Sequence, residues 1–340
     1  MSSPDVVILF GGSSPERKVS VASAQHVAAV LTEAEPWFLA LDGRVHKVAP
    51  DELQSFEQPF VSNFVPRAQP FGETLAAALH PARVFVLALH GGEGEDGTVQ
   101  RQCEDRHIAF TGPGASASAK AFDKEVAKQV ASDAGLRIAE SIHLPSRPLL
   151  VRSLLRELLT VHGRIVAKPV AGGSSVGLHH IVSEAQIEQA AQAIESSGEG
   201  YLAEAFVSGT ELTIGVVDSD AGARALPPSE VRMDAGRAFD YEGKYLGKGT
   251  KELTPAEVSP EITRDAQALA LAAHRALGCE GYSRTDMIVG PQGPVFLEIN
   301  TLPGLTRMSF IPQQLAVEGT TMRAFLDGQI ALAQRRRDRG

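Results

Sequence analysis

The chain has 340 residues, of which 43% are hydrophobic and 21% are charged, and its formal net charge is −9. This composition is typical of a soluble globular protein, and the length exceeds the usual limit of one hydrophobic core, so we expect two or three lobes. The negative net charge argues against nucleic acid as a partner. Neither a long apolar run nor a basic leader is present, which argues against a membrane or secreted protein and favours the cytoplasm. Cys103 and Cys279 are the only cysteines, which argues against a zinc site or a disulfide framework.

The chain begins with a strand that runs into a helix. Val6–Phe10 is an apolar run followed by a glycine pair, and we expect the next helix to have Ser14 as its N-cap and Pro15 in its first position. Glu16 then falls in the first turn. Its carboxylate can interact favourably with the helix dipole, or it can face a ligand in the crevice beyond the strand ends. The residues alone leave both possibilities open.

A strand–helix–strand unit follows an irregular stretch at residues 41–83. Val84–Leu89 is typical of a buried strand and leads into HGGEGEDG, which contains a literal GxGxxG. The carboxylates in this segment would repel a pyrophosphate, so we reject a dinucleotide site here. With a helix at 98–106 and a strand at 108–110, the first third predicts a parallel α/β sheet with right-handed crossovers.

A glycine- and proline-containing turn at residues 112–114 marks the first predicted boundary. Residues 116–134 are then predicted to form one continuous helix. Lys120, Lys124 and Lys128 are spaced by four and therefore share one face of it. From spacing alone, we expect this face to be solvated.

A lysine within an apolar strand is the most informative feature of the middle of the chain. Lys168 lies in the predicted strand Arg164–Pro169, and the segment AGGSSVG and a strand at 178–182 follow. The Gly/Ser turn offers backbone N–H groups and hydroxyls without bulky side chains, so it can fold over phosphates. The Walker A pattern is absent. A plain hairpin turn would leave the buried lysine unexplained.

Two acids and one long loop complete the features expected to contact a ligand. Glu204, in the predicted strand Tyr201–Val207, and Glu211 bracket a strand-to-loop crossing, and their carboxylates could accept hydrogen bonds from an adenine amino group and from ribose hydroxyls. Residues 239–250, FDYEGKYLGKGT, lack periodicity and are typical of a mobile loop that closes on a ligand.

A hairpin is predicted near the C-terminus from two apolar runs, Tyr282–Val289 and Val295–Ile299, joined by GPQGP. Period-two alternation places polar side chains together on one face of each strand: Arg284, Asp286, Glu298 and Asn300. Two carboxylates and an amide oxygen suit Mg²⁺. A solvated hairpin face is the alternative, but the Pro303-Gly304 turn that follows, whose N–H could approach a ligand, favours the metal.

Eight sequence segments, in this order, carry a resemblance to a known family. They are LFGGSSPERKVSVASA, LHGGEGEDGTVQ with FTGPGASASAKAFDK, AKPVAGGSSVG, EAFVSGTELTIGV, DYEGKYL, GYSRTDM and LEINTLPGLT. The chain resembles the D-alanine–D-alanine ligases of the ATP-grasp superfamily essentially end to end. The resemblance implies an α/β protein of three lobes: an N-terminal substrate lobe (1–113), a central lobe with the Gly-rich loop (114–208) and a C-terminal lobe with the metal site (209–340). ATP is expected between the antiparallel sheets of the second and third lobes.

The resemblance also implies ligands and residue roles. The ligands are ATP, D-alanine and Mg²⁺ or Mn²⁺, with two ions expected, and the assembly is a homodimer. The residues matched to the first D-alanine and to the phosphates are Glu16, Lys124, Lys168, Ser174 and Tyr245, and His90 is a substrate residue of the first lobe. Those matched to adenine and ribose are Glu204, Val207 and Glu211, and the metal ligands are Asp286, Glu298 and Asn300. Those matched to the reacting carbonyl and the second substrate are Arg284, Lys244, Gly304, Ser309 and Phe310, with Lys244 also near the nucleotide.

The chain departs from the family pattern beside the second substrate. Arg307 and Met308 stand where Ser-His is common, and Phe310 replaces a frequent leucine. A ligase for another pair of amino acids or another acceptor is therefore a rival interpretation. Tyr245 is retained, which favours an amine rather than D-lactate as nucleophile. A catalytically inactive ATP-binding protein is a second rival, and the complete set of charged site residues argues against it.

Overall fold

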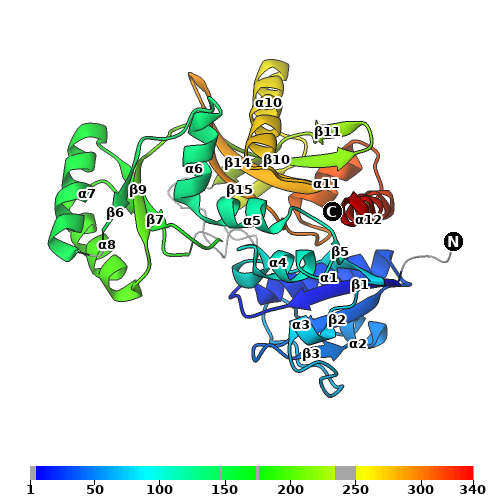
Figure 1. The fold of residues 1–340 in the computed structure, drawn as a ribbon. Coiled ribbons are helices and arrows are strands. Elements are labelled where there is room, and N and C mark those ends of the chain that lie inside the picture. Colours follow the sequence, from blue (N-terminus) through cyan, green and yellow to red (C-terminus); the bar gives the residue numbers. More distant parts are fainter. Residues whose placement is uncertain (1–4, 146, 174–175, 234–249, 340) are drawn as a thin grey trace.

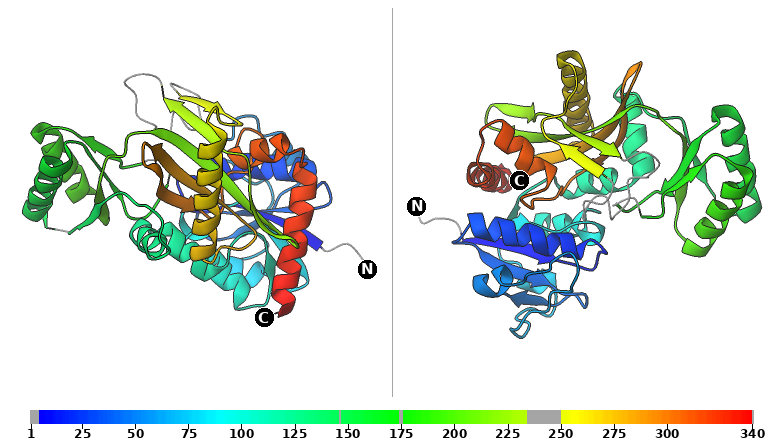
Figure 2. Two further views of the ribbon diagram at one scale, coloured as in Figure 1. Left: turned by 90° about the horizontal axis from the view of Figure 1, so that it is seen from above. Right: turned by 180° about the vertical axis from the view of Figure 1, so that it is seen from behind.

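Three sheets organise the chain in the computed structural model, which describes residues 5–145, 147–173, 176–233 and 250–339 (Figure 1). The first sheet lies in an N-terminal lobe, the second in a central lobe that projects to one side, and the third in a C-terminal lobe (Figures 1 and 2). No helix among the described residues is long and apolar enough to cross a membrane. Both cysteines are buried and free.

The first sheet has the order β3-β2-β1-β4-β5 and is parallel except for the β2–β3 pair. Its strands are β1 (Asp5–Gly11), β2 (Glu35–Leu39), β3 (Val45–Lys47), β4 (Arg83–Leu87) and β5 (Ala109–Phe110). Val6, Ile8 and Phe10 enter the core on one face, and Val7 and Leu9 enter the core on the other. A strand buried on both faces is continuously apolar, which is why β1 was recognisable from its sequence.

Helices surround this sheet, and they include the last helix of the chain. The helices of the lobe are α1 (Arg17–Val30), α2 (Pro50–Gln54), α3 (Leu75–Ala78), the 3₁₀ turn Gly92–Gly94 and α4 (Thr98–Glu104). The closing helices are α11 (Phe310–Val317) and α12 (Met322–Arg339). Phe325, Leu326 and Ile330 of α12 belong to the same buried cluster as Val6 and Ile8 of β1. The two ends of the chain therefore share one core.

The central lobe is an antiparallel sheet with two helices on one face. The strand order is β6-β9-β7-β8, made of β6 (Ser141–Leu144), β9 (Tyr201–Ala205), β7 (Ile165–Pro169) and β8 (His179–Ile181). Helices α7 (Pro148–His162) and α8 (Glu184–Ser197) bury their apolar sides against it. The opposite face of this sheet carries Lys168 and Glu204, which line a cavity.

The C-terminal sheet is antiparallel and has the order β13-β12-β10-β14-β15, with β11 paired to β10. Its strands are β10 (Thr210–Ser219), β11 (Gly222–Ala225), β12 (Ser229–Met233), β13 (Thr250–Leu253), β14 (Tyr282–Gly290) and β15 (Gly293–Asn300). Helix α10 (Pro260–Ala276) covers one face of this sheet together with α5 (Ala115–Phe122) and α6 (Lys124–Asp133). The predicted β14–β15 hairpin is confirmed.

Two helix predictions were wrong in detail. Helix α1 begins at Arg17 with Glu16 as its N-cap, so Ser14 and Pro15 lie in the turn before it. The single helix expected at 116–134 is two helices that break at Asp123. The Asp123 backbone is extended and its side chain accepts from the N–H groups of Glu125 and Val126, so it ends one helix and caps the next. The segment 41–83 also contains short elements that no pattern indicated.

Candidate active site

Two adjoining cavities run between the lobes. The first, about 720 Å³, lies between the N-terminal and C-terminal lobes, and the second, about 520 Å³, lies between the two antiparallel sheets. Four residues line both cavities and so mark where they meet: Lys124, Gly172, Gly173 and Glu298. Most of the described residues that we predicted as site residues line one cavity or the other. The structure thus brings together positions from all three lobes.

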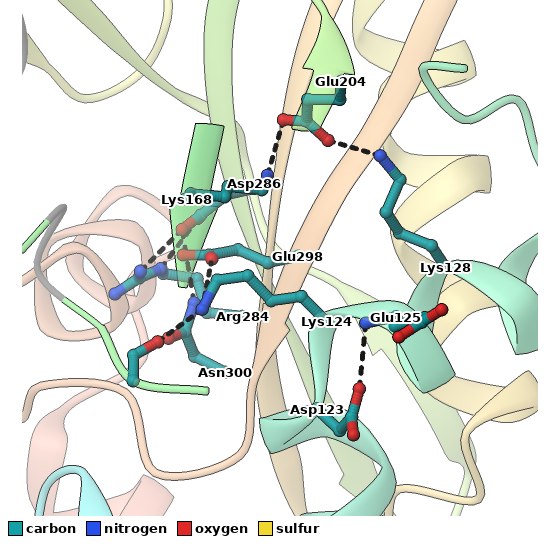
Figure 3. Close-up of polar contacts among 11 residues, drawn as sticks. Asp123, Lys124, Glu125, Lys128, Lys168, Glu204, Arg284, Asp286, Glu298 and Asn300 are labelled. Carbon is teal, nitrogen blue, oxygen red and sulfur yellow. Dashed lines mark hydrogen bonds and ion pairs between the residues drawn. The ribbon is translucent and has the colours of Figure 1, made fainter. Parts of the chain in front are cut away.

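The β14–β15 hairpin holds four polar side chains at this meeting point (Figure 3). Strand register pairs Asp286 with Glu298 and Arg284 with Asn300, with an irregularity just after Asp286. Arg284 donates from Nε and Nη2 to the two oxygens of Asp286 at 2.9 and 2.7 Å, and Asn300 Nδ2 donates to Asp286 Oδ2 at 3.2 Å. Thr213, directly opposite on β10, donates its hydroxyl to Asp286 Oδ1. The predicted shared face is confirmed, and Asp286 is held from three sides.

The donor set of the hairpin fits a hard divalent cation. Asp286 and Glu298 are cross-strand partners, and Asn300 stands next to Asp286. Among the described residues there is no cluster of three His, Cys, Asp or Glu side chains that could hold a metal by themselves. Two carboxylates and one amide are nevertheless enough for Mg²⁺, which commonly shares its coordination with water and substrate phosphates. The Arg284 guanidinium balances the charge of Asp286 in the present arrangement.

Two lysines from different lobes face the hairpin. Lys124, the first residue of α6, donates from Nζ to the Gly172 carbonyl oxygen and lies 3.9 Å from Glu298. Its backbone N–H also donates to the Val170 carbonyl oxygen at 2.9 Å, so it fixes the start of the Gly-rich loop. Lys168, on β7, lies 2.6 Å from Glu204 Oε1. Both ammonium groups are buried at the cavity wall, so Lys124 does not lie on a solvated face.

Glu204 is held by two lysines. Its carboxylate accepts from Lys168 on one oxygen and from Lys128 of α6 on the other. Burial alone would raise the pKa of Glu204, but the two ammonium groups outweigh burial and lower it. The expectation of a solvated face was therefore wrong for Lys128 as well, because this side chain is only 2% exposed. Lys120, in contrast, is exposed.

The far end of the second cavity suits a base and a sugar. Val207 and Glu211 line it, as do the apolar side chains of Val166 and Phe206. Glu211 is paired with Ile288 across the β10–β14 ladder, so it projects from the C-terminal sheet, whereas Val166 belongs to the central sheet. The cavity thus has walls from both sheets, which is the arrangement predicted for a nucleotide.

Glu16 lies where three segments approach each other closely. A Cβ atom added at Gly91 would stand 2.6 Å from Glu16 Oε2, and one added at Gly173 would stand 3.0 Å from it. Gly91 also has a φ of +63°, which L side chains rarely adopt. Glycine at these positions lets the first lobe and the Gly-rich loop approach the carboxylate. Glu16 lines the first cavity and also stands at the N-terminus of α1, so both positions left open for its carboxylate are compatible with the structure.

His90 connects the first lobe to the turn that contains Gly304. Its Nδ1–H donates to the Leu302 carbonyl oxygen at 2.8 Å, so Nε2 accepts from the Ser23 hydroxyl at 2.8 Å. Ser23 Oγ in turn accepts from the N–H of Leu305. Burial lowers the pKa of His90 more than Glu16 raises it, which agrees with the neutral ring that these two hydrogen bonds require. A Cβ atom at Gly304 would stand 2.6 Å from Ser309 Oγ, so a larger residue there would displace the Ser309 side chain.

Three predicted site residues, Ser174, Lys244 and Tyr245, lie outside the described residues, as does most of the loop predicted at 239–250. Their proximity to the cavities stays a prediction.

Two family descriptions match most of the chain. Residues 5–113 match the family described as D-ala D-ala ligase N-terminus, and residues 152–330 match the one described as D-ala D-ala ligase C-terminus. A D-alanine–D-alanine ligase of Leptospira interrogans serogroup Icterohaemorrhagiae serovar Lai (strain 56601) is 34% identical over 347 residues, which cover 97% of this chain and 98% of the relative. The chain belongs to the D-alanine–D-alanine ligase family.

Solved ligase structures share the fold. The VanG D-Ala:D-Ser ligase of Enterococcus faecalis superposes with a TM-score of 0.80 at 26% identity, covering 98% of this chain and 100% of that one. A D-alanine–D-alanine ligase of Bacillus anthracis complexed with ATP superposes with a TM-score of 0.74 at 24% identity, covering 99% of each chain. The resemblance seen in the sequence and the ATP-grasp fold are both confirmed.

In this ligase, the residues that depart from the family pattern surround one end of the first cavity. Arg307, Met308 and Phe310 all line it, next to Ser309. The Arg284 guanidinium lies 5.8 Å from the centre of the Phe310 ring, within the range of a cation–π contact. Ser309 Oγ makes hydrogen bonds with the N–H and hydroxyl of Thr306. Phe310 therefore packs against a predicted catalytic group, while Met308 is largely exposed.

Sequence reasoning missed three polar residues of this ligase site. Lys128 was assigned to a solvated face, and Thr213 gave no signal because a threonine in a strand is common. Glu95 lines the first cavity near Glu16, and its side-chain carboxyl group accepts a hydrogen bond from the Gly91 backbone N–H at 3.2 Å. Burial, together with the charge of Glu16, raises the pKa of Glu95 to about 8. The one feature of the sequence that pointed to Glu95 was its position in the HGGEGEDG segment.

Proposed function

We propose that this ligase joins two D-alanines into D-alanyl-D-alanine at the expense of ATP, in the cytoplasm, for peptidoglycan synthesis. One observation carries the proposal: a cavity matched to the amino acids and a cavity matched to the nucleotide meet at Lys124, Gly172, Gly173 and Glu298. A γ-phosphate held in the second cavity would reach a carboxylate held in the first at this point. The membership of the family supports the same reaction.

The first step is transfer of the γ-phosphoryl group to the carboxylate of the first D-alanine. This carboxylate is a poor electrophile at neutral pH, and its acyl phosphate is a good one. Donor and acceptor are both negative, so catalysis is chiefly a matter of positioning and of compensating charge. Lys124 and Lys168 supply positive charge from two directions, and Glu16 holds the substrate ammonium. Mg²⁺ or Mn²⁺ bound by Asp286, Glu298 and Asn300 would neutralise phosphate charge, and the family resemblance favours two ions.

The second step forms the amide bond. The deprotonated amine of the second D-alanine attacks the acyl carbon, and the carbon–oxygen bond to phosphate then breaks, which releases inorganic phosphate. Negative charge develops on the carbonyl oxygen between attack and departure. The Arg284 guanidinium, fixed by Asp286, and the N–H of Gly304 are the proposed donors to this oxygen. Lys244 and Ser309 are proposed to orient the second carboxylate, and Ser174 and Tyr245 to support Glu16.

The experiment is a coupled assay of the purified protein. With ATP, Mg²⁺ and D-alanine, we expect ADP, phosphate and D-alanyl-D-alanine in equal amounts, identified by mass spectrometry. The same assay over D- and L-amino acids and D-lactate tests the acceptor, because Arg307, Met308 and Phe310, which depart from the family pattern, line the first cavity. Absence of product from D-alanine, with product from another pair, would replace the proposal with an ATP-grasp ligase of different specificity. We also expect a homodimer, to be checked by light scattering.

A further inference from the structure

We propose that Lys128 is a positioning residue for nucleotide binding, which holds Glu204 in place across two lobes. The proposal rests on the assignment of the second cavity to ATP. Lys128 is 2% exposed, and Glu204 and Lys168 beside it are 5% and 7% exposed. An ammonium group this deeply buried carries a large desolvation cost, so it persists only with a good partner.

The three charged groups form one chain of contacts (Figure 3). Lys128 donates to Glu204 Oε2, while Lys168 lies 2.6 Å from Glu204 Oε1. Each carboxylate oxygen therefore has its own lysine. Lys168 and Glu204 line the second cavity, whereas Lys128 lies behind Glu204 and is not among the described residues that line it. Lys128 can act on a nucleotide only through Glu204.

The pair also joins two separate cores. Lys128 belongs to α6, whose Ala127 and Ala131 pack into the core of the C-terminal sheet. Glu204 belongs to β9 of the central sheet, which has its own core. Lys124 stands one turn before Lys128 on the same helix and contacts the Gly-rich loop. One face of α6 thus supplies two lysines that fix the position of the central lobe over the cavity.

This arrangement has a consequence when a nucleotide binds. Lys168 is the proposed phosphate contact, so its ammonium group must interact with both Glu204 and a phosphate oxygen. Lys128 keeps Oε2 fixed and the carboxylate ionised whichever way Lys168 turns. Glu204 Oε1 is then oriented to accept from a donor on the nucleotide, such as the exocyclic amino group of adenine. Burial lowers the pKa of Lys128, but the adjacent carboxylate opposes that effect.

The test measures ADP binding by calorimetry in the presence of Mg²⁺ and without any amino acid. Lys128→Met removes the charge and keeps most of the volume, and we expect binding to weaken about 10- to 100-fold. Lys128→Arg should recover most of the loss. The matched control is Lys120→Met, because Lys120 is exposed on the preceding helix and should not change binding. In steady-state assays, the KM for ATP should rise while the KM for D-alanine stays within about threefold of its original value.

A double-mutant cycle separates positioning from a general structural role. In a Glu204→Gln background the carboxylate is gone, so adding Lys128→Met should cost no further affinity for ADP. If Lys128→Met alone fails to fold, the comparison of Glu204→Gln with the double variant still decides. Equal losses in both backgrounds, unchanged ADP binding by Lys128→Met, or equal rises in both KM values would overturn the proposal. ADP binding does not depend on the amino acid, so failure of the proposed ligation would be recognised separately.

Discussion

The acidic and basic sides of the site are built in different ways. The acidic side comes from one hairpin, where strand register alone brings Asp286 and Glu298 together. The basic side collects Lys124 and Lys128 from a helix and Lys168 from a strand of another lobe. The hairpin is therefore fixed by local geometry, whereas the lysines depend on how the lobes pack. We expect substitutions on the acidic side to affect chemistry most, and those on the basic side to affect nucleotide binding.

The largest effect is expected for Asp286→Asn. The change removes the partner that orients Arg284 and one of the proposed metal ligands, so turnover should fall by at least about 10³-fold. ADP release measures turnover, and circular dichroism checks the fold. Asp265→Asn, on the exposed side of α10, is the control. A variant that keeps a tenth of the original rate would show that the hairpin acid is not part of the chemistry.

Arg284→Met should have the next largest effect. It removes a donor to the developing oxyanion, and the expected loss in kcat is about 10²- to 10³-fold with little change in the KM for ATP. The matched control is Arg264→Met, since Arg264 is exposed. If the variant instead raised the KM for ATP at constant kcat, Arg284 would belong with the nucleotide-binding lysines and the contrast between the two sides would fail.

The contrast also explains how much could be predicted from sequence. The hairpin face, the β1 strand and Lys168 followed from period-two patterns and from a charge within an apolar run. Lys128 could not be placed, because a spacing of four does not tell which face of a helix is buried. The break at Asp123 was hidden by good helix formers on both sides of it. Asp123 caps the second helix because its backbone is extended, and the periodicity of the sequence does not predict that conformation.

The smallest effect is expected for Glu95→Gln. Glu95 lies near Glu16, and its carboxylate accepts a hydrogen bond from the Gly91 N–H. The pKa of Glu95 is raised from 4.5 to about 8 in the folded protein, so the folded chain binds more protons than the unfolded chain between these values. Stability from this group is therefore present at low pH and is lost as the pH rises toward 8.

Glu95→Gln removes this dependence. Relative to the original protein, the free energy of unfolding of the variant should increase by about 1 kcal/mol between pH 5.5 and 8.5, less than the full shift because the side chain is partly exposed. Urea unfolding at both pH values measures it. If the variant and the original protein differ in free energy of unfolding by the same amount at the two pH values, Glu95 has an ordinary pKa. The carboxylates of the first lobe would then be stabilised as well as Glu204 is in the central lobe.

The core shared by β1 and α12 has a consequence for synthesis of the chain. Val6 and Ile8 are translated first, and Phe325 and Ile330 of the same buried cluster, in the helix that lies against β4 and β5, are translated last. The first lobe therefore emerges from the ribosome before the helix that completes its core, and it is expected to need chaperone protection until translation ends.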